Sequence, residues 1–375
     1  MRLNRKRRMA SFLLCIYMLS AFLSVSALAE EADNGSICSA AVSESELSVD
    51  ALSDDVVVGS RLYDLFFKEE KREVRSLIPG GEVFGIKMKQ KFVTVTESTG
   101  VPGLRRGDLI LSINGEEIKS ASRAAELIKN SGGESLTIKA LHGGEEIRIE
   151  VRPTSVDGEY KLGLSLRDGA LGIGTVTYID PETGDFGGLG HGICDSETGA
   201  IIDMETGDIT GVVLGGVHRG ESGKPGELTG VLTDKDLGDL YTNSECGVFG
   251  KLDPEDIKNA DPIPIGRREE VREGEATIIS TVKNGKQCEY KIEIFGIDRS
   301  SEGSKSFRIK VTDPTLKALT GGIVRGMSGS PIIQDGKLVG AVTHVMVADP
   351  TEGYGIFIEN MLDASQTTRN ELPAA

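Results

Sequence analysis

The chain has 375 residues, 48 of them glycine and none tryptophan, and a formal net charge of −16. This length favours roughly two domains of ~100–200 residues each, and the glycine content favours short strands and tight turns over long helices. The acidic balance argues against nucleic acid as the main partner, because binding the phosphate backbone requires clustered Lys and Arg.

The N-terminal segment, residues 1–29, differs from the rest in composition. Basic side chains crowd residues 2–8, residues 9–29 carry no charge, and the stretch ends in Ala27-Leu28-Ala29. A basic head, an apolar run and a small-residue exit predict a secretory signal. The run is also long enough to span a bilayer uncut, so cleavage and membrane anchoring both stay open while export is expected either way.

Residues 30–75 are predicted to be a linker: residues 30–55 are rich in Ser, Ala, Asp and Glu, and residues 54–75 mix apolar and charged residues at the spacing of a possible short helix. The cysteines lie far apart and show neither a CxxC pair nor zinc-ligand spacing. An exported chain could oxidise a pair of them, and the sequence leaves the state of the thiols open. They are Cys15, Cys38, Cys194, Cys246 and Cys288.

Residues 76–155 contain the elements of a small α+β domain. Residues 83–97 are strand-like, and residues 134–153 alternate as two strands around a glycine turn. Between them, residues 122–133 predict one helix with Ala124, Leu127 and Ile128 on one face.

The segment GLRRGDLILSING at residues 103–115 carries a family pattern, and through it this domain resembles a PDZ domain. PDZ domains add a peptide as an extra strand and hold its terminal carboxylate on backbone amides near a glycine. The resemblance places this peptide groove at Gly85, Ile86 and Met88.

Residues 156–375 alternate apolar and polar positions in many short runs separated by glycine-rich turns. Short strands at regular spacing predict a mostly-β sandwich or barrel. The only helix that this stretch suggests is a short one in DPTLKAL, at residues 313–319.

The stretch GMSGSP at residues 326–331 predicts a nucleophile turn. A serine hydroxyl needs a base to accept its proton and hydrogen-bond donors to hold the oxyanion that forms on attack. Glycines allow the backbone to aim two amides at one point, here the N–H groups of Gly326 and Ser328. An apolar hairpin at residues 331–345, with Asp335-Gly336 at its tip, would support the turn. This arrangement resembles the nucleophile region of chymotrypsin-like serine peptidases.

His191, flanked by glycines in GLGHGICD, is the favoured base. His142 and His218 lie in polar turns, and His344 is on a strand where a packed histidine is the plainer interpretation. A carboxylate should hold the far side of the imidazole. Spacing alone does not choose among the candidates, which are Asp195, Asp234, Asp236 and Asp313.

The order of an exported head, a PDZ-like domain and a β-rich domain with these two stretches is similar to the stage IV sporulation protein B family of signalling serine peptidases. The resemblance covers about residues 70–365. It implies a chymotrypsin-like double β-barrel and a triad of His191, Asp313 and Ser328. It also implies secretion from the forespore into the space between two membranes, self-cleavage, and a cut in a membrane-bound regulatory complex that releases processing of a late sigma factor. The PDZ domain would steer these cleavages.

Two other interpretations stay open. A non-catalytic PDZ scaffold outside the membrane would bind peptide tails and leave Ser328 unreactive. A Ser–Lys processing protease would use a lysine base, and His191→Ala would then leave its activity intact. No cofactor is expected, because the four histidines are scattered and neither HExxH nor a phosphate-binding GxxxxGK[ST] occurs.

Overall fold

The computed structural model describes residues 75–371 except for residues 197, 254, 256–259 and 284. The chain divides into Met1–Lys71 and Arg72–Ala375, and all described residues belong to the second unit. The predicted signal segment (1–29) and, apart from Arg75, the predicted linker (30–75) therefore lie outside the described residues. Among the described helices, none combines the length and apolar character that crossing a membrane requires.

The first barrel is an antiparallel sheet that closes because β2 pairs with both β9 and β11. Its interior is apolar and includes Ile86, Phe186 and Val248. A short strand, β1, pairs with β9 at the barrel and with β14 on its other side. The barrel strands are β2 (Val83–Ser98), β9 (Leu164–Ile179), β10 (Asp185–Gly188), β11 (Met204–His218), β12 (Glu227–Ser244) and β13 (Gly247–Leu252), with β1 at Ser76–Pro79 and β14 at Ile263–Pro264.

The second barrel is closed in the order β15-β16-β17-β20-β19-β18. The predicted hairpin after the serine turn is confirmed: β18 and β19 pair around Asp335 (φ 53°) and Gly336 (φ 72°). The strands are β15 (Gly274–Lys283), β16 (Lys286–Phe295), β17 (Phe307–Val311), β18 (Pro331–Gln334), β19 (Lys337–Val345) and β20 (Glu352–Phe357).

Two helices accompany this barrel. The short helix α4 (Pro314–Thr320) confirms the helix expected near residues 313–319. The C-terminal helix α5 (Ile358–Glu371) was not predicted. Its Met361 and Leu362 join a buried cluster with Tyr178 and Phe249 of the first barrel and Ala341 of the second, so α5 covers the junction of the barrels.

A PDZ-like module is built from β3 to β8 and α3, together with residues 93–98 of β2 and 164–167 of β9. The helix prediction is confirmed: Ser120 caps α3, and Ala124 and Ile128 are buried. The elements are β3 (Leu109–Ile113), β4 (Glu116–Glu117), α3 (Ala121–Asn130), β5 (Leu136–His142), β6 (Glu145–Val151), β7 (Thr154–Val156) and β8 (Glu159–Lys161).

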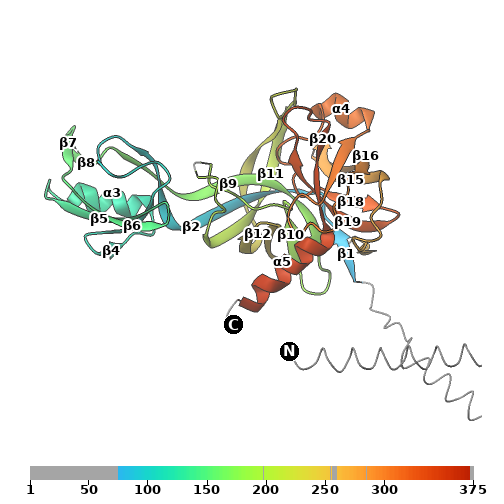
Figure 1. Ribbon diagram of the computed structural model, residues 1–375, viewed down its shortest axis with the longest axis horizontal. Helices are drawn as coiled ribbons and strands as arrows, with labels where there is room; N and C mark the ends of the chain where they lie inside the picture. Colours follow the sequence, from blue (N-terminus) through green and yellow to red (C-terminus); the bar gives the residue numbers. More distant parts are fainter. Residues whose placement is uncertain (1–74, 197, 254, 256–259, 284, 372–375) are drawn as a thin grey trace, which may run out of the picture. The chain divides into compact units, whose positions relative to one another are not determined.

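The structure corrects the expected boundary between a domain at 76–155 and a domain at 156–375. Residues 83–89 of β2 pair with residues 169–175 of β9 inside the first barrel, while residues 93–98 continue into the PDZ-like module. Both strands thus run from the barrel into the module (Figure 1). The module is inserted between the first strands of the barrel rather than placed before it. The alternation of apolar and polar residues along a strand cannot predict this insertion, because the alternation is the same whichever strand becomes the pairing partner.

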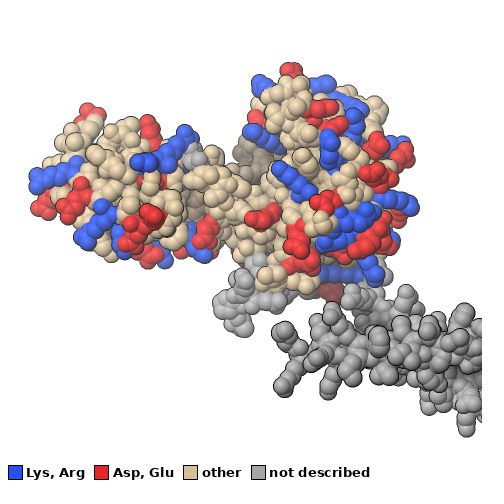
Figure 2. Space-filling view, viewed as in Figure 1, with Lys and Arg blue, Asp and Glu red and all other residues tan. Residues whose placement is uncertain are grey.

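Acidic and basic side chains are intermingled on the face of the molecule that Figure 2 shows. No broad basic surface is present on that face.

Candidate active site

Ser328 lies in a tight turn between the barrels, just before β18. The Gly329 amide donates to the Val342 carbonyl at 2.7 Å, and the Ser330 amide donates to the Met327 carbonyl at 2.9 Å. Gly329 has φ +95°, and a Cβ added there would lie 1.9 Å from the Thr175 carbonyl oxygen. A glycine is therefore required after the serine both by the backbone conformation and by the close approach of β9.

Two buried threonines of β9 hold this turn from the first barrel. The Thr175 hydroxyl donates to the Gly326 carbonyl at 2.7 Å, and the Thr177 hydroxyl donates to the Gly329 carbonyl at 2.8 Å. The Thr175 amide also donates to the Ser328 carbonyl at 2.9 Å. Both threonines are 0% exposed. These threonines were not predicted as part of the site, although polar residues two apart in the run TVTYI indicate a polar contact from a buried strand face.

The backbone amides of Gly326 and Ser328 have no hydrogen-bond acceptor among residues 75–371 as described, whereas the carbonyls of both residues are bonded. Gly326 has φ +96°. Two free amides beside a serine hydroxyl are what an oxyanion requires. The oxyanion-hole assignment stays a prediction, and this geometry is compatible with it.

His191 leaves β10 through two left-handed residues, Leu189 (φ 65°) and Gly190 (φ 68°). A Cβ added at Gly190 would lie 2.9 Å from Cγ2 of Thr343, so the chain carrying His191 passes directly against β19. The imidazole lies against the ring of His344, with 4.7 Å between ring centroids. The glycine before the histidine thus has the role that the sequence suggested, a close approach to another segment.

The hydrogen bonding of His191 defines its tautomer. Nδ1 lies 2.9 Å from the Gly192 carbonyl oxygen, and a carbonyl can only accept. Nδ1 therefore carries the proton, and Nε2 is the basic nitrogen of the neutral ring.

Ser328 and His191 are brought to neighbouring residues of β19. The Ser328 hydroxyl donates to the Thr343 carbonyl at 2.6 Å, and His191 contacts the adjacent His344. No hydrogen bond joins Ser328 to His191 among the described residues. For proton transfer, the serine hydroxyl must therefore give up its hydrogen bond to the Thr343 carbonyl and form one to Nε2 of His191. Catalytic hydrogen bonds commonly form or shorten in this way only when substrate binds.

Burial keeps both imidazoles neutral. It lowers the pKa of His191 from its usual value, against the opposing effect of the Gly192 carbonyl. Burial lowers the pKa of His344 to about 4, with further contributions from Lys305 and from His191 when that ring is protonated at low pH. Both rings face an open cavity of about 360 Å³ whose charged side chains are Glu245 and Lys305. A neutral His191 is the form that can accept a proton.

No aspartate bonds to His191 in the part of the chain that the structure describes. Asp313 caps α4, where its Oδ1 accepts from the amides of Thr315 at 2.8 Å and Leu316 at 3.0 Å. Asp195 binds Arg167 and Thr198, and Asp236 accepts from the Gly238 amide. Asp313 as third triad member therefore stays a prediction, and the Gly192 carbonyl holds the imidazole in this conformation.

The other two histidines have acidic partners outside this site. His142 lies 2.7 Å from Asp108 in the PDZ-like module, and His218 is exposed beside Glu227 at 3.0 Å.

The structure corrects the predicted peptide groove at Gly85, Ile86 and Met88. These residues pair with β9 and β11 in the first barrel, and Ile86 and Met88 belong to its core. A glycine between two apolar residues also occurs at Leu162-Gly163-Leu164, where the chain enters the module side of β9. A glycine between two apolar residues is too short a pattern to distinguish Phe84-Gly85-Ile86 from Leu162-Gly163-Leu164 as the start of the groove.

An open strand edge lies at the second of these places. Residues 164–167 of β9 pair with β2, and the described strands supply no partner on their other side. Helix α3 lies next to this edge, where the Ala121 amide donates to Asp168 at 2.8 Å. An edge beside a helix is the arrangement that PDZ domains use to add a peptide strand.

Two closed antiparallel barrels, with a serine turn and a histidine meeting at their junction, define a chymotrypsin-like serine peptidase that here carries an inserted PDZ module. The model of the SpoIVB peptidase S55 family matches residues 158–362, more than half of the chain. The chain belongs to that family and is a serine endopeptidase. A PDZ-domain model matches residues 103–141, which confirms the PDZ prediction.

Solved structures that resemble this chain include proteases and a PDZ domain. The HtrA-type protease AlgW with decapeptide is 14% identical over 77% of this chain and 64% of that chain, with a TM-score of 0.34. The active form of the Rv3671c protease from M. tuberculosis is 12% identical over 53% and 74%, with a TM-score of 0.31. The PDZ domain of an SdrC-like protein from Listeria monocytogenes is 28% identical over 20% and 87%, with a TM-score of 0.19. A search of curated proteins found no match.

Proposed function

We propose that this chain is an exported endopeptidase of spore-forming bacteria that cleaves itself and then a membrane-associated regulatory protein, and so triggers processing of a late sigma factor. The observation that carries the proposal is the family match over the barrels that hold the GMSGSP turn. Export would deliver the chain from the forespore to the intermembrane space, and residues 1–29 would be its signal or its anchor.

The geometry supports an acyl-transfer mechanism. Nε2 of His191 takes the proton of the Ser328 hydroxyl as the oxygen attacks the substrate carbonyl. The amides of Gly326 and Ser328 hold the resulting oxyanion, and the imidazolium returns the proton to the leaving amine. Water, with its proton taken by the same imidazole, then releases the acyl group from Ser328. The carboxylate of Asp313 is the proposed third member of the triad.

The PDZ module would select what is cleaved. A protein or peptide segment, including one from the chain itself, can add to residues 164–167 of β9 beside α3. We place the recognition of the membrane-bound complex at this edge.

The proposal is tested by mapping the N-termini of the purified full-length protein by mass spectrometry, in parallel with labelling by a fluorophosphonate. The wild type should label at Ser328 and yield self-cleaved N-termini, and Ser328→Ala should do neither. Ser330→Ala is the matched control, because Ser330 is a buried serine of the same turn whose hydroxyl has no partner among the described residues. Unlabelled wild-type protein that still binds peptide tails would instead favour the PDZ scaffold.

A further inference from the structure

The histidine is carried by a small hairpin, residues 191–196 and 198–202, which we call the His191 hairpin. Its two arms pair through Cys194 and Ile201, and the Ile202 amide donates to the Ile193 carbonyl at 3.0 Å. On the barrel side, the Asn243 side chain accepts from the Ile193 amide at 2.7 Å and donates to the carbonyls of Ile193 and Ile202. One end of the hairpin is thus fixed to β12, next to His191.

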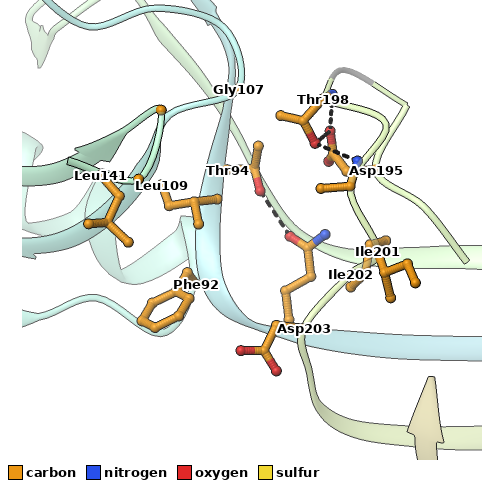
Figure 3. Close-up of a pocket in the computed structure, with 14 residues that line it drawn as sticks. Phe92, Thr94, Gly107, Leu109, Leu141, Asp195, Thr198, Ile201, Ile202 and Asp203 are labelled. Atoms are coloured by element: carbon orange, nitrogen blue, oxygen red, sulfur yellow. Dashed lines mark hydrogen bonds between the residues drawn. The ribbon is translucent and has the colours of Figure 1, made fainter. Parts of the chain in front are cut away.

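The far end of the His191 hairpin is fixed to β9 through a charged pair. Asp195 is 6% exposed, and its Oδ2 accepts from the Arg167 guanidinium. Its Oδ1 accepts from the amide of Thr198 at 2.9 Å, across the tip of the hairpin (Figure 3). Arg167 also donates to the Ser196 hydroxyl at 3.2 Å. A buried carboxylate depends on such partners, because an uncompensated charge in a protein interior is costly.

Apolar packing alone does not fasten the hairpin to the module. A cavity of about 330 Å³ separates Ile201 and Ile202 of the hairpin from Phe92 of β2 and from Leu109 and Leu141 of the PDZ module (Figure 3). Beside this cavity, a Cβ added at Gly107 would lie 2.8 Å from Cγ2 of Thr198, so the two parts touch near the hairpin tip. With a cavity in the contact, the directional Arg167–Asp195 pair gains importance in fixing where the hairpin lies.

Arg167 belongs to the stretch of β9 that forms the open peptide edge, where it pairs with Thr94 of β2. The same strand ends with Thr175 and Thr177, which hold the Ser328 turn. One strand therefore touches the module edge, the His191 hairpin and the nucleophile turn. A displacement of the strand at Arg167 changes the support of the histidine relative to the serine.

We propose that Arg167 is a positioning residue for catalysis: by holding Asp195, it makes the PDZ module part of the support that brings His191 to Ser328. The proposal rests on the role of His191 as base. Arg167 is thereby part of the catalytic site although no sequence motif indicates it. The reactivity of Ser328 then depends on the open strand edge at residues 164–167 of β9.

The test compares the rate at which a fluorophosphonate labels Ser328 in full-length wild type, Arg167→Gln, Asp195→Asn and the double variant. Each single change should slow labelling, by a factor within the range of about 5 to 150 that couplings between sites usually show. The double variant should lose less than the two single losses combined, because no unpaired buried charge is left. The midpoint of the labelling–pH curve should also rise in the single variants, as a displaced His191 becomes better hydrated.

Arg75→Gln is the matched control, since Arg75 and Asp180 form a 2.8 Å pair with side-chain exposures of 39% and 14%, against 31% and 8% for Arg167 and Asp195. It should label at the wild-type rate. Thermal melting is recorded for every variant, and if Arg167→Gln fails to fold, Arg167→Lys is measured in its place and should show a smaller loss.

Wild-type labelling rates in the Arg167 variants would overturn the proposal. The proposal would also fail if the labelling rate fell in proportion to the melting temperature, and equally, in the Arg167 and Arg75 variants. It would fail as well if the losses of labelling rate in the two single variants added up in the double variant while the midpoint of the labelling–pH curve stayed unchanged. Failure of the wild type itself to label would instead count against the proposed function, which keeps the two failures distinguishable.

Discussion

The side chains around Ser328 are positioned by neutral partners rather than by a carboxylate. The Gly192 carbonyl sets the tautomer of His191, the Thr343 carbonyl holds the serine hydroxyl, and Thr175 braces the turn. Hydrogen bonds of this kind are each worth only about 0.5–1.5 kcal/mol. Small rearrangements between a resting and a working site are therefore accessible energetically.

The lowered pKa of His191 predicts the acid limit of the peptidase. Burial penalises the imidazolium, so the ring stays neutral to a pH below its ordinary value of about 6.5. The rate of fluorophosphonate labelling at Ser328 should therefore rise with pH and reach half its maximum below pH ~6.5.

The stability of the fold should also rise with pH, because the pKa of His344 is about 4 in the folded state and about 6.5 in the unfolded chain. Its contribution to the free energy of unfolding is complete above pH ~6.5 and is lost as the pH falls through about 4. Chemical denaturation across this range measures this contribution.

For the labelling of Ser328, a midpoint at pH 7 or higher would contradict the assignment of His191 as a buried neutral base.

Among the elements, those with strong local signals were the ones that the sequence predicted correctly. Helix α3 has its cap at Ser120 and an apolar face, and the β18–β19 hairpin has Asp335-Gly336 at its turn. Helix α5 was missed, because its buried face is defined by contacts with both barrels rather than by a strong apolar stripe of its own. The groove at Gly85 was misplaced for the same reason, since β11 and β9 decide the position of that strand.

The cap of α4 gives a test of Asp313 at this scale. Replacing a capping Asp by Ala removes acceptors for the first amides of the helix, so Asp313→Ala should lower the free energy of unfolding by about 1 kcal/mol. Asp313→Asn keeps a capping oxygen and should stay within a few tenths of a kcal/mol of wild type. Denaturant titration measures both, and equal stabilities of the two variants would contradict the capping role.

The same pair of variants decides the proposed triad. If the carboxylate acts in catalysis, the stable Asn variant should lose activity by a factor on the order of 10⁴. If Asp313 acts only as a cap, the Asn variant should cleave and label like wild type while the Ala variant follows its stability.

At the scale of the whole molecule, the PDZ module is an insertion within the peptidase domain rather than a separate domain joined to its end. Strands β2 and β9 belong to the barrel at one end and to the module at the other. Since β9 also carries Arg167 and Thr175, the peptide edge and the catalytic turn share one continuous backbone. The PDZ module is therefore placed to act on the peptidase as well as to bind its substrate.

This connectivity predicts how the chain can be divided. A fragment of residues 156–375 lacks β1 and β2, which leaves the barrel edges of β9 and β11 unpaired. It should show no cooperative unfolding by circular dichroism and no labelling by a fluorophosphonate, whereas residues 75–371 should show both. A fragment 156–375 that folds and labels like the longer one would contradict the shared barrel.

The sequence by itself predicted the PDZ module, the serine peptidase class and the two short helices α3 and α4, because each of these is encoded by neighbouring residues, while the roles of Ser328 and His191 stay predictions. Tertiary structure alone decided which strands share a barrel, that Thr175 and Thr177 hold the turn and that Arg167 meets Asp195. These contacts join residues far apart in the chain. The two-residue repeat of a strand is the same for every possible partner, so no local pattern can specify them.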